Sequence, residues 1–585
     1  MCGIIAYAGK DNAVPYLVNG IRDLEYRGYD SAGCALDNGD KLIIRKDVGS
    51  VNSVIRNYGV EQLNAKRGVF HTRWATHGGI SVQNAHPISD CSGDIAVVHN
   101  GIIENYDSIK ESLNAHKFST ETDTEVIPHM VEEKMRLGKS FREAVKETAL
   151  KLEGASSFVV LNRNEKDMIA VKKGSPLVIG LGENGMFISS DVQSLLRYTN
   201  KVVYLHDNDL VTFNESGYTV ENLANPNITH KVDTVDLDYH SAEKGKFEHY
   251  MIKEIYEQID LVNSFLERDK KDIEYASSLI RKANRVYFVG SGTSHHASLY
   301  GAQLFRSLGI DALALQGQEL KNYGKIIKDN DIFIIISQSG ETSDVIANMD
   351  YMKDHKKIGI INVEGSYLSR SVDALIPLKA GVEKAVAATK SFTSTLVLLR
   401  LLAAYLSDDV EPAINDLKLL KLNIYNLTVP SVLETIERVS DRLKDDKTII
   451  YTGTEDGFIL SLEGALKMKE VSYIHAEAFD SSSIKHGPIA LIEDGVDVIA
   501  VTTKKSKESL AYGLEEMKAR GAHIIGISEE NNPKLFDEFI KSVPAKSFEF
   551  YPLLMVLQML AYRTAVKRGI DPDKPRNLAK SVTVK

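Results

Sequence analysis

Cys2, the second residue of the chain, is the first candidate for chemistry. If Met1 is removed, Cys2 carries both a thiol and a free α-amine, whose pKa of about 7.7–8.0 lets it act as a base near neutral pH. The amine can take the thiol proton, directly or through a water, and so activate the nucleophile. Gly3 allows close approach of the backbone to a substrate. A buried, unreactive cysteine in a strand is the competing interpretation.

Two Ser/Gly/Thr turns in the carboxy-terminal half are candidates for phosphate binding. One, SQSGET at 337–342, directly follows the apolar run 332–336 and precedes a predicted helix over 343–353. Hydroxyls and amides there meet the positive end of a helix dipole, which suits a phosphate monoester without a lysine. The turn GSGTS at 290–294 is similar, although most such turns alone are simple caps. Two such turns at neighbouring strand ends predict a phosphate site more strongly. We expect one site per chain, because the later turn at 502–506 lacks this chemistry.

Three charged residues, Glu463, Lys467 and Glu470, are spaced to share one face of a predicted helix. A solvated, salt-bridged face is the plain interpretation of this spacing, but leucine and methionine neighbours could dock the helix instead. By composition alone, Lys580 is a solvated charge in the tail, and His486 is a histidine in a Lys-His-Gly-Pro turn.

Composition limits the classes of protein that fit. The chain has 585 residues, 43% hydrophobic and 26% charged, which predicts about three to five soluble domains. Its net charge of −10 argues against a nucleic-acid partner, and three cysteines argue for a reducing cytosol rather than a disulfide framework. No basic segment precedes the short apolar run at 4–8, and the longest apolar run, 396–406, is too short to span a bilayer. We therefore expect a cytoplasmic protein without a membrane partner.

About the first 230 residues predict an α+β domain whose strands pack in layers. They contain all three cysteines and the single tryptophan, Trp74. Short runs typical of strands occur at 2–7, 41–45, 95–99, 157–161, 177–179, 202–206 and 209–213. Helical patterns lie at 14–24, 108–115, 124–137 and 141–152.

The rest of the chain contains an internal repeat at an offset of about 165 residues. The matches are 286–290 with 449–453, 332–337 with 497–502, 358–362 with 524–528, and Pro377 with Pro544. The matching runs are β-branched, almost wholly apolar and separated by helix-length segments, which is the pattern of parallel sheets covered on both faces. We predict two doubly wound α/β units, with ligands beyond the carboxyl ends of the strands.

A polar, charged stretch at 235–246 separates these halves, and a helical segment at 248–266 follows it. The predicted organisation is a first domain over 2–236, a linker over 237–247, and two α/β domains over 248–428 and 429–585.

Five segments of the first domain resemble the N-terminal-nucleophile glutamine amidotransferases. They are EYRGYDSAG at 25–33, HTRWATHG at 71–78, NAHP at 84–87, HNGIIEN at 99–105 and ETDTE at 121–125. The resemblance implies a layered αββα fold and an active Cys2. It implies that Arg73 pairs with the glutamine α-carboxylate, Asp123 holds the α-ammonium, and Asn100 with the Gly101 amide forms the oxyanion hole. It further implies pocket roles for Arg27, Thr76, His77 and His86, and ammonia gating by Trp74, although a loop histidine is often only a hydrogen-bond partner.

The two turns of the second half, SQSGETSD at 337–344 and GSGTS at 290–294, resemble the sugar isomerase (SIS) domains. With the tail KPRNLAKSVTV at 574–584, the whole chain is similar to the glutamine–fructose-6-phosphate aminotransferase family. This resemblance implies that Glu470 moves a proton between C1 and C2 of the sugar, with Lys467 and Glu463 supporting it. The implied sugar-phosphate site contains Gly292, Thr293, Ser294, Ser337, Gln338, Ser339, Thr342 and Val386.

The resemblance also gives roles to His486 and Lys580. His486 would open the sugar ring, reaching into a neighbouring subunit, so a homodimer is implied. Lys580 would form an imine with C2 of the open-chain ketose, and such an amine needs a lowered pKa from desolvation or from a nearby cation such as Arg576.

The implied reaction moves the amide nitrogen of glutamine to fructose 6-phosphate, gives glucosamine 6-phosphate and glutamate, and opens the hexosamine pathway. No metal or organic cofactor is implied, and no His, Cys and carboxylate cluster at ligand spacing suggests one. Four residues depart from the family pattern, namely Ser482, Ser483, Ala388 and Ile259. Two other functions are considered: a related enzyme with a different acceptor or running as a deaminase, and a sugar-phosphate sensor that does not turn over.

Overall fold

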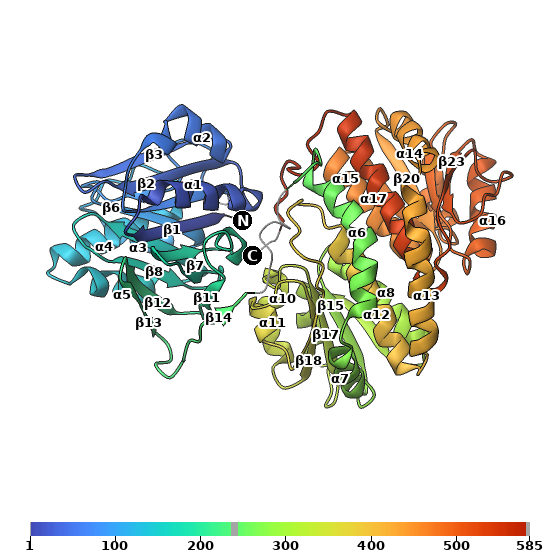
Figure 1. Ribbon diagram of the computed structural model, residues 1–585, viewed down its shortest axis with the longest axis horizontal. Helices are drawn as coiled ribbons and strands as arrows, with labels where there is room; N and C mark the ends of the chain where they lie inside the picture. The colour runs from blue at the N-terminus through green and yellow to red at the C-terminus, as the bar shows by residue number, and fades with distance from the viewer. Residues whose placement is uncertain (1, 76, 236–243, 581–585) are drawn as a thin grey trace. The chain divides into compact units, whose positions relative to one another are not determined.

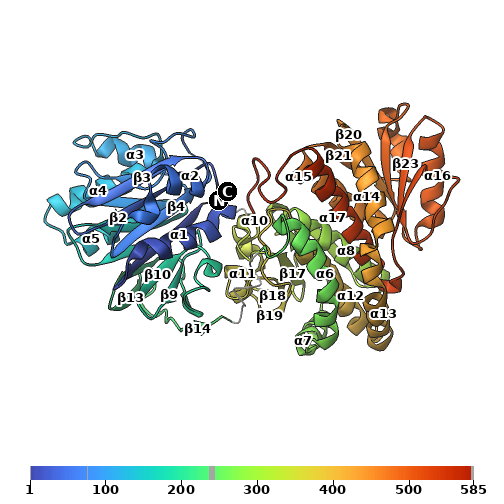
Figure 2. The same cartoon turned by 45° about the horizontal axis from the view of Figure 1, so that its top comes forward.

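The computed structural model describes residues 2–75, 77–235 and 244–580. The chain divides into two compact units, one within residues 1–241 and the other within residues 242–580 (Figures 1 and 2). No helix among the described residues is long and apolar enough to cross a membrane.

The amino-terminal unit contains two antiparallel sheets. The eight-stranded sheet has the order β14 (Asp233–Thr234), β11 (Lys201–Tyr204), β9 (Val178–Leu181), β10 (Gly185–Ser189), β1 (Gly3–Gly9), β4 (Arg67–Arg73), β2 (Ser31–Asp37), β3 (Leu42–Val48). The six-stranded sheet has the order β13 (Gly217–Asn222), β12 (Asp209–Asn214), β8 (Met168–Lys172), β7 (Ser156–Asn162), β6 (Ile95–Gly101), β5 (Ile88–Ser89).

Helices cover the outer faces of both sheets, and three apolar clusters fill the spaces between the four layers. The first cluster joins α1 (Ala13–Leu24) and α2 (Val51–Asn57) to the eight-stranded sheet. The second lies between the sheets, and the third joins the six-stranded sheet to α3 (Tyr106–Ser112), α4 (Val126–Arg136) and α5 (Phe141–Lys151). The predicted αββα architecture is confirmed.

The carboxy-terminal unit contains two five-stranded parallel sheets. The first has the order β16 (Ala312–Gln316), β15 (Val286–Gly290), β17 (Ile332–Ser337), β18 (Lys356–Ile361), β19 (Ala374–Pro377). The second has the order β21 (His475–Asp480), β20 (Thr448–Gly453), β22 (Asp497–Val501), β23 (His523–Ser528), β24 (Glu538–Lys541). The shared order confirms the predicted repeat of doubly wound sheets. One pairing in that repeat is wrong: Pro377 ends β19, whereas Pro544 lies beyond the end of β24.

One apolar core joins the two halves of this unit, because it contains side chains from both sheets and from the helices between them. Helix α6 (Tyr250–Glu267) runs beside α17 (Phe550–Lys567) in the middle of the unit (Figure 1). Both α12 (Lys390–Leu406) and α17 are buried along most of their length, so their sequences are apolar on all sides. The apolar run at 396–406 is therefore a core helix.

The remaining helices of this unit lie on the outer faces of the sheets or connect the strands. They are α7 (Lys271–Ile280), α8 (Thr293–Ser307), α9 (Leu320–Tyr323), α10 (Ser343–Ile346), α11 (Tyr367–Arg370), α13 (Val410–Asn423), α14 (Pro430–Leu443), α15 (Asp456–Ser472) and α16 (Lys507–Lys518).

Candidate functional site

Cys2 lies at the start of β1, beside the end of β4, because Gly3 is paired with Thr72 across the two strands. The backbone N–H of Trp74 donates to the Cys2 Sγ at 3.2 Å, and the Trp74 carbonyl oxygen lies 3.5 Å from the same sulfur. Burial raises the pKa of the Cys2 thiol, although the Trp74 N–H and the Arg73 charge act in the opposite direction. The sulfur is therefore held in place as a thiol, and a base must remove its proton before it can attack.

The predicted oxyanion residues, Asn100 and Gly101, end β6 next to the Cys2 backbone. The Asn100 side-chain N–H donates to the Cys2 carbonyl oxygen at 3.1 Å, and its Oδ1 lies 3.2 Å from the His71 Nε2. Gly101 has a φ of +146°, and a Cβ there would lie 1.9 Å from the Ala155 carbonyl oxygen. Only glycine fits this position. The preceding residue, Asn100, has its amide donor beside the backbone of the nucleophile Cys2.

Arg73 interacts electrostatically with both Cys2 and the oppositely charged Asp123. The Arg73 guanidinium donates to the carbonyl oxygens of His77 at 2.5 Å and of Gly78 and Gly79 at 3.3 Å. Burial lowers the Arg73 pKa, and the negative groups around it, Asp123 among them, act the other way. Asp123 accepts a hydrogen bond from the Ile103 N–H at 2.7 Å. A buried guanidinium and a buried carboxylate are the pair that an amino-acid zwitterion requires.

The other residues predicted to bind glutamine already have partners within the protein. Arg27 is buried and lies 2.9 Å from Asp191. His86 is buried, accepts from the His99 N–H at 3.4 Å, and has its pKa lowered well below the usual value by burial, so its ring is neutral. His77 is half-buried and meets the Tyr106 ring edge-on. Thr76 lies outside the described residues.

The first phosphate turn follows β17 directly. The Ser337 Oγ lies 2.9 Å from the Thr342 Oγ1 and accepts from the Gly340 N–H at 2.9 Å, while the Ser339 Oγ accepts from the Glu341 N–H at 3.1 Å. Gly340 has a φ of +67°, and a Cβ there would lie 1.8 Å from the Ser366 Oγ. The turn thus presents hydroxyls and amides at the carboxyl end of a strand.

The predicted helix over 343–353 is wrong. The structure has only α10, followed by a separate 3-10 helix over Met349–Met352. The Asn348 side chain donates to the Asp344 carbonyl oxygen at 2.7 Å, and such a bond competes with continuation of a helix. A dipole from a long helix therefore does not contribute to this turn.

The second turn begins the longer helix α8, at the end of β15, which neighbours β17 as predicted. Gly292 has a φ of +56°, which favours glycine. Thr293 donates to the Glu463 Oε1 at 3.0 Å and so joins the first sheet's turn to α15 of the second half.

Two members of the charged cluster of α15, Glu463 and Lys467, are buried, and Glu470 is partly buried. Lys467 lies 2.5 Å from Glu470, 3.3 Å from Glu463 and 3.3 Å from the Thr293 hydroxyl, and the side chains of Lys467 and Glu463 are 1% exposed. Burial lowers the Lys467 pKa, but the two carboxylates raise it more, so the net shift is upward. The His296 Nδ1 lies 2.7 Å from the second Glu463 oxygen. The solvated-face interpretation of this helix is therefore wrong.

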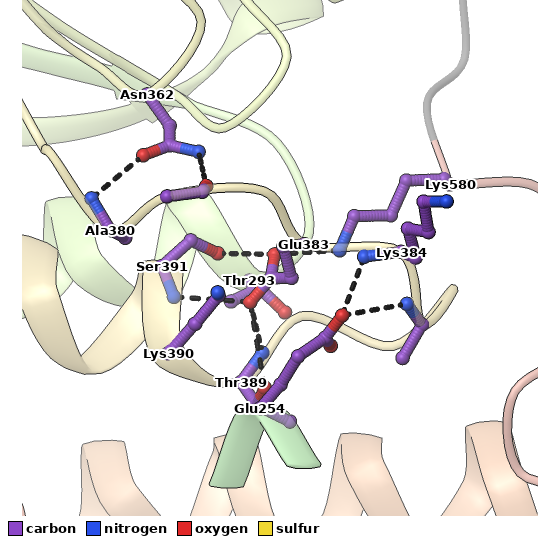
Figure 3. A network of polar contacts seen from close by, with 12 residues as sticks. Glu254, Thr293, Asn362, Ala380, Glu383, Lys384, Thr389, Lys390, Ser391 and Lys580 are labelled. Atoms are coloured by element: carbon purple, nitrogen blue, oxygen red, sulfur yellow. Dashed lines mark hydrogen bonds and ion pairs between the residues drawn. The ribbon is translucent and has the colours of Figure 1, made fainter. Parts of the chain in front are cut away.

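Lys580 is buried against a carboxylate that the sequence did not single out. Its Nζ lies 2.6 Å from the Glu383 Oε2, and the two side chains are 4% and 0% exposed. Figure 3 shows Glu383 also accepting from the Thr389 N–H at 3.0 Å, and from the Ser391 N–H and hydroxyl at 3.1 and 2.7 Å. Burial acts to raise the Glu383 pKa, but Lys580 and these donors lower it to about 2. Lys580 is therefore no solvated tail charge.

A second buried carboxyl, Glu254 on α6, belongs to the same network (Figure 3). It accepts from the N–H groups of Lys384 and Ala385 at 2.5 and 3.1 Å. Burial and the Glu383 charge raise its pKa to about 8, although Lys580 acts to lower it.

The tail that carries Lys580 is fixed upstream by Asp573. The Asp573 carboxylate accepts from the N–H groups of Tyr250 and Met251, at 2.8 Å each, and thereby caps α6. The Asp573 carbonyl oxygen accepts from the Val386 N–H at 3.4 Å, which places Val386 beside the tail. Arg576, the expected second cation, is exposed and stacks on the Tyr473 ring at 4.3 Å.

His486 has no contact with the Glu383–Glu254–Lys580 network among the described residues. It is exposed on a 3-10 helix over Ile484–His486, and its backbone N–H donates to the Ser483 carbonyl oxygen at 3.0 Å. Within the described residues, its imidazole has no hydrogen-bond or ion-pair partner.

Sequence reasoning missed three carboxylate or imidazole partners in this unit: Glu254, Glu383 and His296. Each is a single residue without a local spacing pattern, and each gains its role from contacts with distant parts of the chain. A charged residue inside an apolar loop, such as Glu383 within GVEKAVAA, was the available signal.

The chain is similar to known proteins over its full length. A glutamine amidotransferase domain model matches residues 71–197, and a SIS domain model matches residues 279–405 and 442–566. Proteins of Thermococcus kodakarensis and Thermotoga maritima, both named glutamine–fructose-6-phosphate aminotransferase (isomerizing), are each 39% identical over the whole of both chains. The solved C-terminal domain of the Francisella tularensis glucosamine-fructose-6-phosphate aminotransferase has a TM-score of 0.51 and 29% identity, covering 57% of this chain and 99% of that one. The chain therefore belongs to the glutamine–fructose-6-phosphate aminotransferase family.

Proposed function

We propose that this chain transfers the amide nitrogen of glutamine to fructose 6-phosphate and isomerises the product to glucosamine 6-phosphate, releasing glutamate. This is the first step of hexosamine synthesis. The observation that carries the proposal is the burial of Lys580 on Glu383, because a desolvated amine is the kind of lysine that can form an imine with a carbonyl substrate. Family membership and the Cys2 environment support the glutamine half.

In the first half-reaction, Cys2 attacks the amide carbon of glutamine. Its thiol proton passes to the α-amine that is free once Met1 is removed. Asn100 and the Gly101 N–H stabilise the negative oxygen of the tetrahedral intermediate, while Arg73 and Asp123 hold the two charges of the amino acid. Ammonia leaves past Trp74, and water then hydrolyses the thioester to glutamate.

In the second half-reaction, the Lys580 ammonium gives up a proton, and the neutral amine attacks the C2 carbonyl of open-chain fructose 6-phosphate. The proton is returned to the hydroxyl of the adduct, which leaves as water and gives the imine. Ammonia displaces the lysine and leaves an imine at C2. Glu470 takes the proton from C1, and protonation at C2 gives the 2-amino aldehyde, which closes to the product. Lys467 and Glu463 set the charge around this carboxylate.

The phosphate group is held by the two turns, whose hydroxyls and amides lie at neighbouring strand ends. The proposed phosphate and sugar contacts are Gly292, Thr293, Ser294, Ser337, Gln338, Ser339, Thr342 and Val386. The exposure of His486 supports ring opening by His486 in a neighbouring subunit, so we propose that the protein is a homodimer. We also propose that it works in the cytoplasm.

The test is an assay of glutamate and glucosamine 6-phosphate together, using the full chain with glutamine and fructose 6-phosphate. Equal amounts of the two products are expected, with no amino sugar from glutamine in Cys2→Ala or Lys580→Ala. Cys2→Ala should still form amino sugar from ammonium, and Lys541→Ala, an exposed lysine on β24, should match the parent. Glutamate without amino sugar would indicate another acceptor, and neither product, with Met1 removed, would reject the proposal.

A further inference from the structure

Four metal-ligating side chains from three segments meet in the amino-terminal unit, away from Cys2 in the sequence. They are Cys91 in the turn between β5 and β6, His116 after α3, and His129 and Glu132 on α4. One ligand atom from each lies within 4.8 Å of all the others. The spacing of these residues along the sequence does not indicate the cluster, because Cys91 is 25 residues from His116 and 38 from His129.

We propose that these four residues bind a zinc ion in tetrahedral geometry. The Cys91 Sγ lies 3.6 Å from the His116 Nδ1 and 3.7 Å from the His129 Nδ1. The Glu132 Oε2 lies 3.1 and 3.6 Å from the same two nitrogens. With zinc bonds of about 2.3 Å to sulfur and about 2.0–2.1 Å to nitrogen or oxygen, a tetrahedron has edges of about 3.6 and about 3.3–3.4 Å. The four measured distances are close to these edges, and the ligand atoms of all four side chains lie within 4.8 Å of one another.

The outward nitrogen of each histidine faces a carboxylate, as is usual for imidazoles that bind a metal. The His116 Nε2 lies 3.1 Å from the Glu133 Oε2, and the His129 Nε2 lies 3.5 Å from the Glu125 Oε1. These contacts turn both Nδ1 atoms toward the sulfur. The Glu132 Oε1 pairs with Arg136 at 2.5 Å, which leaves the Glu132 Oε2 facing the cluster.

The charge of the site also suits zinc. A thiolate and a carboxylate together neutralise a divalent cation, while the two imidazoles bind as neutral ligands. His116, His129 and Glu132 are buried, and Cys91 is exposed, so an ion has a route in from the surface. On binding, the Cys91 thiol gives its proton to solvent, so binding strengthens as pH rises. Soft sulfur with imidazole favours zinc over magnesium or calcium.

The alternative is a set of imidazolium–carboxylate pairs without a metal. Those pairs account for the Glu125, Glu132 and Glu133 contacts, and the Cys91 N–H also donates to the Glu132 Oε2 at 3.2 Å. However, a single S–H proton can be donated to only one of the two Nδ1 atoms that lie 3.6 and 3.7 Å from the sulfur. With zinc, one ion joins the β5–β6 turn and the segment after α3 to α4. Because Glu125 both faces His129 and precedes α4, the ion would also steady the 3-10 helix over Asp123–Glu125. The role is structural, and it does not depend on the proposed reaction.

The test uses the full chain without a histidine tag. Metal content is measured by mass spectrometry after gel filtration, and a chelator-treated sample is titrated with zinc, and separately with cobalt(II), while absorption and thermal unfolding are followed. We expect one zinc per chain, an unfolding midpoint that rises until one equivalent is added, and a cobalt spectrum with a thiolate charge-transfer band and intense tetrahedral visible bands.

Cys91→Ser should lose the charge-transfer band and weaken zinc binding at least tenfold, and His116→Gln should do the same for affinity. His475→Gln, an exposed histidine elsewhere, is the matched control and should bind as the parent does. The cobalt titration of the parent chain needs no variant, so misfolding of a variant cannot mask the result. Absence of a tetrahedral spectrum and of any zinc-dependent midpoint shift would overturn the proposal, as would a Cys91→Ser variant that binds with undiminished affinity.

Discussion

Glu254 keeps its proton at neutral pH because it is buried and because Glu383, in the same network, keeps its negative charge. Burial and the Glu383 carboxylate raise the Glu254 pKa to about 8. The Glu383 pKa is lowered to about 2, since Lys580 and four hydrogen bonds outweigh the effect of burial. One ammonium is thus matched to one carboxylate, and the second carboxyl stays neutral.

Replacing Glu383 by Gln should leave Lys580 without its counter-charge. Removing one partner of a buried ion pair costs about 3–5 kcal/mol of folding free energy. We expect a lower unfolding midpoint, and at least a tenfold loss in borohydride trapping of fructose 6-phosphate on Lys580. Glutamine hydrolysis at Cys2 should persist. Glu530→Gln, from the exposed Lys507–Glu530 pair, is the control, and undiminished trapping in Glu383→Gln would contradict the assigned role.

Glu254 should make stability fall as pH rises. Its folded pKa of about 8 lies above the ordinary carboxyl value, so the folded state binds more protons between about 4.5 and 8. That contribution is full below about pH 4.5 and is lost as pH passes 8. Glu254→Gln should therefore flatten the decline of the unfolding free energy, measured by urea unfolding, over this pH range. The slope should change by at most about 1.4 kcal/mol per pH unit. Parallel pH profiles of parent and variant would show that Glu254 is ionised throughout.

Glu383 should act in the opposite pH window. Its folded pKa of about 2 lies below the ordinary value, so its contribution is present above about pH 4.5 and is lost as pH falls toward 2. Comparing the acid unfolding of the parent with that of Glu383→Gln isolates this contribution. The variant should show a shallower loss of stability below pH 4.5; an unchanged acid limb would argue that Lys580 does not hold the Glu383 charge.

Asn100→Ala should slow glutamine hydrolysis about 10²–10³-fold in kcat, the usual effect of removing one oxyanion donor. Amination by added ammonium should change little, because Asn100 contacts Cys2 rather than the sugar site. Glutamate release and ammonium-dependent product formation would be measured side by side. Asn57→Ala on α2 serves as the control, and a matched loss of both activities would indicate a folding defect instead.

Glu470→Gln should separate imine formation from proton transfer. The amide keeps the shape of the side chain near Lys467 but cannot take a proton from C1. Borohydride trapping on Lys580 should survive, whereas exchange of solvent deuterium into the sugar and formation of amino sugar should be lost. Deuterium exchange at the rate of the parent would remove Glu470 from its assigned role.

His486→Ala and Lys580→Ala chains, each inactive alone, should regain part of their activity when mixed and allowed to exchange subunits. One mixed site would then combine His486 from one chain with Lys580 from the other. Activity is measured after mixing and compared with each variant mixed with itself. No recovery, with exchange confirmed by mass spectrometry, would place His486 in its own chain's site or outside the site altogether.

The parallel sheets were predictable because their strands are continuous apolar, β-branched runs, as in Ile332–Ser337 and its partner Asp497–Val501. The strand Ser31–Asp37 was missed, since its glycine, aspartate and alanines are residue types that are depleted in strands. Its burial comes from the fold, not from its own pattern.

Site residues that belong to a sequence motif were predictable, whereas the residues that form hydrogen bonds or ion pairs with them were not. Cys2 and Lys580 were identified from the ends of the chain and from family resemblance. Glu383, Glu254 and the Cys91 cluster arise from contacts between segments far apart, which no spacing rule records. The helix over 343–353 failed because a side-chain hydrogen bond from Asn348 replaced a backbone one.

The cap that Asp573 gives to α6 has a consequence for how the chain is made. The two amides it accepts from lie 322 and 323 residues earlier, so a growing chain displays Tyr250 and Met251 long before their acceptor is synthesised. The amino-terminal unit can fold while the ribosome is still working, whereas the second unit can cap its central helix α6 only after Asp573 has been synthesised. A nascent or prematurely terminated chain would therefore carry a finished amide-hydrolysing half beside an unfinished sugar half.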